Sequence, residues 1–200
     1  MFITFEGIDG SGKSTQISLL KTYLSTKNIQ SHIFREPGGT DISERIRSLL
    51  LHDTEEMDPV TELLLFSSAR SQLIAEKVIP LLENNETVIL DRFYDSTVAY
   101  QGYGRQSASL NDIDHLNRIA AHGLVPDLTF YLRLSIENAD RRTSSNDKDR
   151  MEKSGRAFFD KVSEGFDELS SREKRFKVID ANREKAKVHQ EIVNHVESLL

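Results

Sequence analysis

Residues 2–15 read FITFEGIDGSGKST, an apolar segment of strand length that runs directly into a glycine-rich stretch. Within it, GIDGSGKS fits the pattern G-x-x-x-x-G-K-[S/T], which binds phosphate when it follows a strand and opens a helix. Both conditions are met here, because a helical pattern begins at Lys13. The glycines let successive backbone N–H groups converge on phosphate oxygens, and the start of the helix adds positive potential.

The loop pattern also predicts a role for its side chains. Lys13 is expected to reach the β- and γ-phosphates of ATP, and the Ser14 hydroxyl is expected to bind Mg²⁺. The residues predicted to hold the nucleotide are Gly7, Ile8, Asp9, Gly10, Ser11, Gly12, Lys13, Ser14 and Thr15.

Apolar runs of strand length alternate with longer helical patterns along the whole chain. The alternation predicts an α/β fold, a P-loop NTPase-like parallel sheet of about five strands flanked by helices on both faces. Ligands of such sheets bind at the carboxyl ends of the strands. The predicted strands are 2–6, 31–35, 87–91, 128–134 and 176–180. The predicted helices are 13–27, 43–51, 59–83, 110–122, 136–142, 155–174 and 184–200.

Two segments interrupt this alternation. Residues 35–41 (REPGGTD) contain a proline and paired glycines, which predicts a loop. Residues 143–154 are polar and nearly free of large apolar side chains, and a loop of this kind in a compact domain is usually functional. We interpret it as a mobile lid. No repeat or linker divides the chain, so residues 1–200 are expected to form a single P-loop domain.

Composition excludes several classes of protein. The net charge is −6, whereas a protein that wraps nucleic acid is usually basic. No apolar run approaches the roughly 20 residues of a membrane helix, and the N-terminus lacks the features of a signal peptide. There is no cysteine, which excludes disulfides and thiolate metal sites. We therefore expect a cytoplasmic protein with neither nucleic acid nor membrane as partner.

Asp91 and Arg92 follow the apolar run TVIL, so both are expected at the carboxyl end of a buried strand. An Asp at this place holds Mg²⁺, directly or through water, in other P-loop enzymes. The alternative is that Asp91 only caps the next helix. The guanidinium of Arg92 suits phosphate oxygens in the ligand crevice.

Five side chains are expected to converge near the same strand end. Phe66 and Arg70 lie four residues apart on a helical pattern and share one face. Thr97, Tyr100 and Gln101 are spaced i, i+3 and i+4 shortly after the strand that ends at 91. Together these side chains offer an aromatic plane, a cation, a hydroxyl, a phenol and an amide. This set suits a nucleobase better than a sugar or a peptide.

Taken together, five motifs resemble thymidylate kinase of the bacterial kind. They are FEGIDGSGKST (5–15), REPGGT (35–40), LLFSSAR (64–70), DRFYDSTVAYQG (91–102) and DRME (149–152). The similarity extends from residue 1 to about residue 182, and the combination is specific. The resemblance implies that ATP phosphorylates dTMP to dTDP, as part of dTTP biosynthesis, and that the chain forms a homodimer.

The resemblance also implies roles at the thymidine nucleotide. Phe66 would stack on thymine, Arg70 would donate to O4, and Thr97 and Gln101 would meet N3–H. Tyr100 would crowd the sugar 2′ position. Pro37 would help wall the base pocket, and Arg47 and Arg92 would bind the monophosphate. Asp9 would approach the 3′-OH and the phosphate–metal region. Glu36 is also expected to contact the substrate.

One departure from the family pattern leaves the catalytic cation open, and another concerns Arg133. Some members carry an arginine in the P-loop where this chain has Gly10. Arg142 and Arg150, at the start of the lid and within it, are then the candidates for an arginine finger, with Lys148 as a further lid cation. Arg133 stands where an acidic or amide side chain is common in the family, and nothing in the sequence accounts for it.

Three alternatives were weighed against a monophosphate kinase. A deoxynucleoside kinase needs no arginines for an acceptor phosphate, whereas Arg47 and Arg92 supply them. A GTP-binding switch protein would carry an N-K-x-D motif, which the sequence lacks. A non-catalytic nucleotide-binding module would leave the acceptor side chains unexplained. The predicted helix 59–83 is apolar on more than one side, which permits a homodimer without requiring one.

Overall fold

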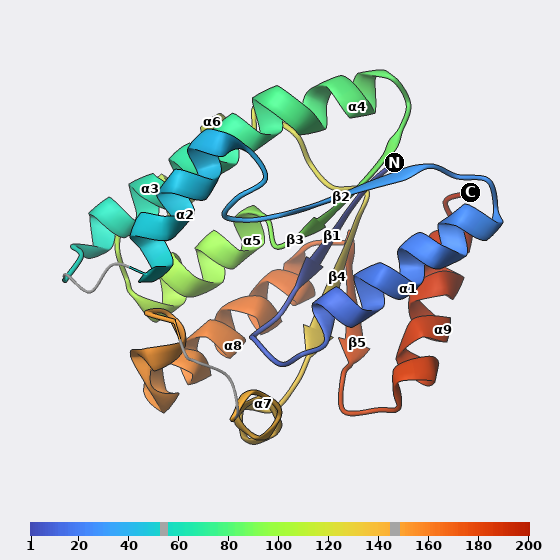
Figure 1. The fold of residues 1–200 in the computed structure, drawn as a ribbon. Helices are drawn as coiled ribbons and strands as arrows, with labels where there is room; N and C mark the ends of the chain where they lie inside the picture. The colour runs from blue at the N-terminus through green and yellow to red at the C-terminus, as the bar shows by residue number, and fades with distance from the viewer. Residues whose placement is uncertain (53–55, 145–148) are drawn as a thin grey trace.

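A computed structural model describes residues 1–52, 56–144 and 149–200. Five parallel strands form one sheet in the order β2-β3-β1-β4-β5. Figure 1 shows the sheet at the centre of the molecule with helices on both sides. The fold class predicted from the strand–helix alternation is therefore confirmed. The strands are β1 (Phe2–Glu6), β2 (Ser31–Arg35), β3 (Thr87–Asp91), β4 (Leu128–Arg133) and β5 (Phe176–Asp180).

The strand order sets the place of the ligand crevice. β1 lies between β3 and β4, with Phe5 paired to Asp91 on one side and Phe130 on the other. After β1 the chain crosses to β2, which forms one edge of the sheet. β4 and β5 lie on the other side of β1, and β5 forms the opposite edge. Ligands bind near such a switch point, at the carboxyl ends of the strands. All five residues of β1 are buried, as expected for an interior parallel strand covered on both faces.

Helices form a layer on each face of the sheet (Figure 1). Helices α1 (Lys13–Thr26) and α9 (Lys185–Glu197) pack together on one face. The other face is covered mainly by α3 (Pro59–Leu73), α5 (Tyr94–Thr97) and α8 (Arg156–Arg172). The other helical elements are α2 (Asp41–His52), η1 (Ile74–Val78), α4 (Ile79–Glu83), η2 (Val98–Gly104), α6 (Leu110–Ala120), α7 (Ile136–Thr143) and η3 (Glu152–Ser154).

The helix predicted over 59–83 is one continuous rod with a wider turn inside it. Asp58 caps its start, because its carboxylate accepts from the amides of Val60 and Thr61 at 3.0 and 3.1 Å. Residues 74–78 form a π-helical turn, in which Ile79 N–H donates to the carbonyl of Ile74 five residues earlier. Pro80 follows directly, and its missing N–H explains why regular α-helical bonding is interrupted here.

A second π-helical segment was not predicted as an element. After β3 the chain forms the short α5 and then η2, where the amide of Arg105 donates to the carbonyl of Tyr100 at 2.8 Å. Four consecutive residues of η2 are buried, from 99 to 102. Single π-helical turns are frequent at functional sites, and this one carries two of the predicted base contacts, Tyr100 and Gln101.

The predicted lid is described only in part, since residues 145–148 lie outside the described residues. Its first residues belong to α7, and its last form the short helix η3. Met151 is buried, so this end of the segment packs against the domain. In the described part of the chain, no helix combines the length and the apolar character needed to cross a bilayer.

Candidate active site

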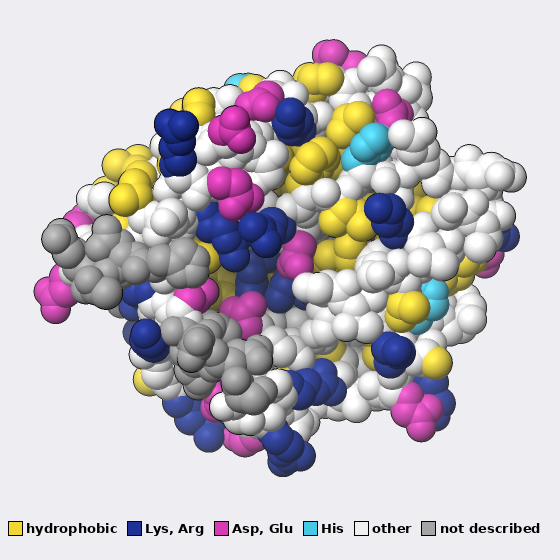
Figure 2. All heavy atoms as spheres, viewed as in Figure 1, with side chains coloured by type: hydrophobic (Ala, Val, Ile, Leu, Met, Phe, Trp, Pro, Cys, Tyr) yellow, Lys and Arg dark blue, Asp and Glu magenta, His cyan; other side chains and the backbone are white. Residues whose placement is uncertain are grey.

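A cavity of about 710 Å³ opens at the carboxyl ends of the central strands. Figure 2 shows Lys, Arg, Asp and Glu side chains gathered around a hollow in this face of the molecule. Residues from segments far apart in the sequence meet there. The predicted site residues that line it are Asp9, Gly10, Ser11, Gly12, Lys13, Ser14, Thr15, Glu36, Pro37, Arg47, Phe66, Arg70, Asp91, Arg92, Thr97, Tyr100, Gln101 and Arg142.

The P-loop wraps the start of α1 as its sequence predicts. Gly7 has φ of 132°, and a Cβ atom there would lie 2.6 Å from the carbonyl oxygen of Leu132, so only glycine fits. Gly12 is in the left-handed region at φ 92° and precedes α1, whose first turn no described side chain caps. Helix N–H groups without a cap and a helix dipole suit an anion.

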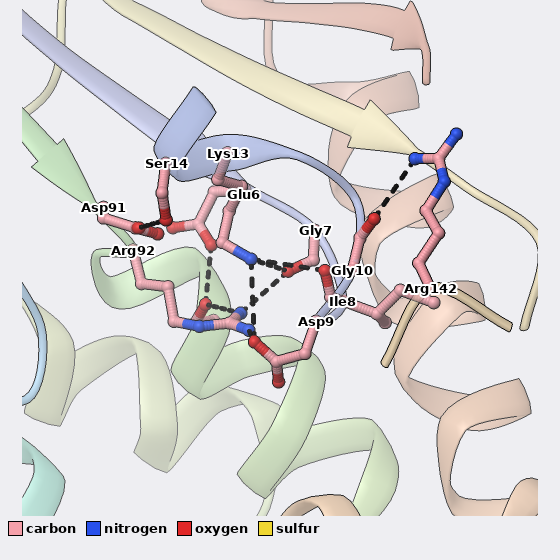
Figure 3. A network of polar contacts seen from close by, with 11 residues as sticks. Glu6, Gly7, Ile8, Asp9, Gly10, Lys13, Ser14, Asp91, Arg92 and Arg142 are labelled. Atoms are coloured by element: carbon pink, nitrogen blue, oxygen red, sulfur yellow. Dashed lines mark hydrogen bonds and ion pairs between the residues drawn. The ribbon is translucent and has the colours of Figure 1, made fainter. Parts of the chain in front are cut away.

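The Lys13 ammonium points into the P-loop (Figure 3). Its Nζ donates to the carbonyls of Gly7 and Ile8 at 3.0 and 3.2 Å, and lies 3.9 Å from Asp9 Oδ1. Burial, followed by the nearby Arg92 guanidinium, lowers the pKa of Lys13. The loop carbonyls therefore hold a desolvated cation beside the backbone amides that would bind phosphate.

Ser14 and Asp91 meet across the junction of α1 and β3. Ser14 Oγ donates to Asp91 Oδ2 at 3.2 Å (Figure 3). A hydroxyl and a carboxylate are hard oxygen ligands, and Mg²⁺ in kinases takes only one or two such protein ligands besides phosphate and water. No cluster of three or more His, Asp or Glu metal ligands occurs among the described residues, and a Mg²⁺ site of this kind needs none. The pair fits the ion.

Arg92 links the P-loop to the loop after β3. Its Nη1 donates to the Gly7 carbonyl at 2.8 Å and its Nη2 to Asp9 Oδ1 at 2.9 Å. Burial alone would raise the pKa of Asp9, but Arg92 and then Lys13 outweigh it and lower that pKa to about 2. Asp9 is therefore a carboxylate at every physiological pH, placed between two cations.

Glu6 supports this loop, and sequence reasoning missed it. Its carboxylate accepts from the amide of Phe93 at 2.8 Å and from Ser96 Oγ at 2.6 Å. Burial, together with the charge of Asp95, raises the pKa of Glu6 to about 8. An acidic residue closing an otherwise apolar strand was the available signal.

The predicted base-contacting side chains line the same cavity as the P-loop. Arg70 is almost fully buried, with Nε donating to Glu36 Oε2 at 2.8 Å and Nη1 to Asn117 Oδ1 at 3.2 Å. Burial raises the pKa of Glu36 to about 7 despite this partner. Phe66 lies one helical turn before Arg70 and also lines the cavity. Arg70 thus keeps a fixed orientation beside an aromatic plane.

The hydroxyls of Thr97 and Tyr100 are covered by protein and have no hydrogen-bond partner in the described part of the chain. The Tyr100 ring lies under the Arg92 guanidinium, with 5.1 Å between the guanidinium carbon and the ring centroid. Burial raises the pKa of the Tyr100 phenol. Gln101 lines the cavity beside them, and its Nε2 donates to Glu62 Oε1 at 2.8 Å.

A sequence profile described as thymidylate kinase matches residues 5–192. The chain belongs to the thymidylate kinase family. Thymidylate kinases of Chlorobium phaeobacteroides and Chlorobaculum tepidum are 46% and 44% identical to it, with 96% and 100% of this chain and 93% and 98% of theirs aligned. A crystal structure of thymidylate kinase from Ehrlichia chaffeensis superposes with a TM-score of 0.79 at 36% identity, covering 98% of both chains. The family resemblance predicted from the motifs is confirmed.

Within this thymidylate kinase fold, the structure separates the two predicted lid arginines. Arg142 lines the cavity, with Nη1 donating to the Gly10 carbonyl at 3.2 Å and Nη2 to the Ala181 carbonyl at 3.0 Å. Figure 3 shows its contact with Gly10, and the second contact joins it to the segment after β5.

Arg150, the other candidate for the arginine finger, is paired away from the cavity, and its catalytic role stays a prediction. Its Nη2 pairs with Glu62 at 2.6 Å and its Nε donates to the Leu50 carbonyl at 2.8 Å, and it is not among the residues that line the cavity. The physical reason is that Glu62 is a buried carboxylate, which needs a cation nearby. Lys148, the further lid cation, lies outside the described residues.

Two further arginines named from the sequence have defined partners. Arg47 donates from Nη1 to the Pro37 carbonyl at 2.8 Å. Arg133 lies outside the cavity and pairs with Asp167 at 2.6 Å, which accounts for a residue that the sequence left unexplained.

Several residues of the site were not predicted. The unpredicted residues that line the cavity are Gln16, Arg35, Leu51, Phe93, Ser96, Asp149, Met151, Ala181, Arg183, Lys185 and Val188.

Proposed function

We propose that this chain transfers the γ-phosphate of ATP to dTMP, giving ADP and dTDP. The observation that carries the proposal is one cavity lined both by the P-loop and by Phe66, Arg70 and Gln101. Membership in the thymidylate kinase family supports dTMP as the acceptor. The alternatives are less well supported, because Arg47 and Arg92 in the same cavity suit an acceptor that already carries a phosphate.

The donor half of the reaction rests on the P-loop. Backbone amides and the start of α1 would bind the ATP phosphates, with Lys13 on the β- and γ-phosphates. Ser14 and Asp91 would hold Mg²⁺, and the ion would neutralise charge on the phosphates when bound. Arg142, which lies beside Gly10 and lines the cavity, is our candidate for the cation that stabilises the transferring group.

The acceptor half needs positioning more than acid–base chemistry. The phosphate of dTMP is ionised at neutral pH, so an oxygen of it can attack without a strong general base. Arg92 and Arg47 would bind that phosphate and hold it in line with the donor. Asp9, fixed between Lys13 and Arg92, would orient both cations and approach the 3′-OH.

Base recognition follows from the buried groups of the cavity. Phe66 would stack on thymine, and Arg70 would donate to O4. Cytosine carries an amino group at that position. The Arg70 guanidinium and this amino group are both hydrogen-bond donors, so no hydrogen bond would form between them. A site built to hydrogen-bond one group rejects an analogue that lacks it by large factors.

The test is an ADP-release assay with Mg-ATP and a panel of acceptors. We expect kcat/KM for dTMP to exceed that for dCMP, dAMP and dGMP by at least about 10²-fold. Chelation of Mg²⁺ should stop transfer, and thymidine itself should not serve as acceptor. Comparable rates with dTMP and dCMP, or a preference for thymidine, would contradict the proposal.

We also propose a single kinase domain that pairs into a homodimer. Two helices in mutual contact, α2 and α3, expose large apolar side chains, each about half accessible to solvent. A symmetric dimer would bury such a surface, since the same patch meets itself across a two-fold axis. The exposed side chains are Ile42 and Leu49 on α2 and Val60 and Leu64 on α3.

A further inference from the structure

Glu62 is a buried carboxylate on α3 that phosphoryl transfer does not use. Its side chain is 1% exposed. Oε1 accepts from Gln101 Nε2 at 2.8 Å and lies 3.5 Å from Arg105 Nε, while Oε2 lies 2.6 Å from Arg150 Nη2. One carboxylate therefore joins α3, the π-helical segment η2 with the residue that follows it, and the described end of the predicted lid.

The contact with Glu62 decides which way the Gln101 amide faces. A carboxylate has only acceptor atoms, so the NH₂ group of the amide must be the one that faces it. The opposite orientation would bring oxygen against oxygen inside a buried site. Gln101 also lines the cavity, as do Arg70 and Thr97. The amide oxygen Oε1 is therefore the group of Gln101 left for a ligand.

Glu62 is itself held in place on both sides. Arg150 also donates to the Leu50 carbonyl at 2.8 Å, and Arg105 also donates to Ser154 Oγ at 2.8 Å. These anchors keep two guanidinium groups against the carboxylate and leave its Oε1 directed at Gln101. A fixed carboxylate fixes the amide, whereas a neutral amide in its place would permit both orientations of Gln101.

We propose that Glu62 is a positioning residue for base selection, an inference that rests on the proposed function. By turning the Gln101 oxygen toward the cavity, it makes the site select a base with a ring N–H donor at position 3. Thymine has this donor, whereas cytosine has an acceptor there. Arg70 and Gln101 would then read neighbouring positions of the same base edge, and cytosine would be mismatched at both.

The test compares dTMP with dCMP in the full-length chain. In Glu62→Gln we expect the ratio of kcat/KM for the two acceptors to fall at least about tenfold, as expected for one hydrogen bond at a buried site. The change should appear mainly as a higher KM for dTMP, with KM for ATP within about twofold of the parent value. If the role of Glu62 were purely structural, kcat/KM would fall by a similar factor for both acceptors and their ratio would not change.

Two further variants make the test specific. Gln101→Met should lower the same ratio, and adding Glu62→Gln to it should lower the ratio no further, because the two residues act through one contact. Glu76→Gln, the same change at an exposed glutamate of η1 that does not line the cavity, is the matched control, and its ratio should stay near the parent value. Circular dichroism and thermal unfolding would establish that each variant folds.

The outcomes separate this inference from the proposed function. A parent enzyme that does not phosphorylate dTMP overturns the proposed function. A parent that prefers dTMP, with an unchanged ratio in Glu62→Gln, overturns the positioning role alone. If Glu62→Gln fails to fold, Gln101→Met decides instead, because an unchanged ratio there means that the Gln101 amide does not select the base.

Discussion

Arg92 shows how the site uses strain at a single residue. Its φ of 71° is left-handed, which costs a residue with a Cβ atom about 1–2 kcal/mol. Two buried hydrogen bonds hold the turn, from Arg92 N to the Phe5 carbonyl at 2.9 Å and from Phe93 N to Glu6 at 2.8 Å. The turn brings the guanidinium to Asp9, which fixes the cation that we propose for the acceptor phosphate.

Lys13 is the residue whose loss should separate chemistry from folding. In Lys13→Ala we expect kcat to fall at least about 10²-fold, because the charge on the β- and γ-phosphates is lost. The fold should remain, since the partners of Lys13 are loop carbonyls that water can reach once the side chain is shortened. The ADP-release assay and circular dichroism measure the two effects.

Lys21 provides a matched control for this substitution. It is an exposed lysine on the same helix, and Lys21→Ala should keep kcat and the dichroism spectrum of the parent. A near-normal kcat in Lys13→Ala would remove the P-loop lysine from the mechanism.

Residues of local motifs could be placed from the sequence, and partners from distant segments could not. The P-loop and the Ser14–Asp91 pair follow from a strand, a glycine pattern and a second strand end. The contacts of Glu6 with Ser96 and of Glu62 with Gln101 span 90 and 39 positions, respectively. Nothing in a helical or strand pattern reveals such a pairing, because it depends on the packing of whole elements.

At the scale of elements, the strands were predicted more accurately than the helices. Four of the five strands have the predicted limits, because a buried parallel strand reads as a short apolar run with polar ends. The π-helical turns at 74–78 and 98–104 were missed, since a wider turn leaves no separate trace in hydrophobic spacing. The segment 143–154 was interpreted as a lid, and its mobility stays a prediction.

The two ends of the lid should respond differently to arginine loss. In Arg142→Ala we expect kcat and kcat/KM to fall together by at least about 10²-fold, since an arginine finger acts on the transition state. In Arg150→Ala we expect a smaller fall in kcat and a lower unfolding midpoint, because Glu62 loses a close cationic partner. Steady-state kinetics and thermal unfolding measure these effects.

Binding of dTMP without ATP supplies the control for this pair. Calorimetry should give a similar Kd for Arg142→Ala and the parent, since that arginine is expected to act on the transferring phosphoryl group. If Arg142→Ala keeps kcat within a few-fold of the parent while Arg150→Ala does not, the catalytic cation belongs to Arg150 and the ion pair with Glu62 must open during the reaction.

At the scale of the whole molecule, the charges of the site oppose the overall charge. The chain carries a net charge of −6, yet arginines and two lysines gather around one cavity (Figure 2). Local cations in a concave site focus the potential there, so an anionic nucleotide is attracted despite a negative surface elsewhere.

The proposed homodimer makes a prediction about a single exposed leucine. Leu64 on α3 is 50% exposed in the isolated chain, and in a symmetric dimer every substitution there occurs twice in one interface. Leu64→Arg would place two charges in the apolar centre of that interface, so we expect a monomer at micromolar concentration with an unchanged dichroism spectrum. Val125→Arg, at an exposed apolar residue outside α2 and α3, should leave the dimer intact. Light scattering coupled to gel filtration gives the mass directly, and a monomeric parent, or a Leu64→Arg variant that remains dimeric, would count against pairing through α3.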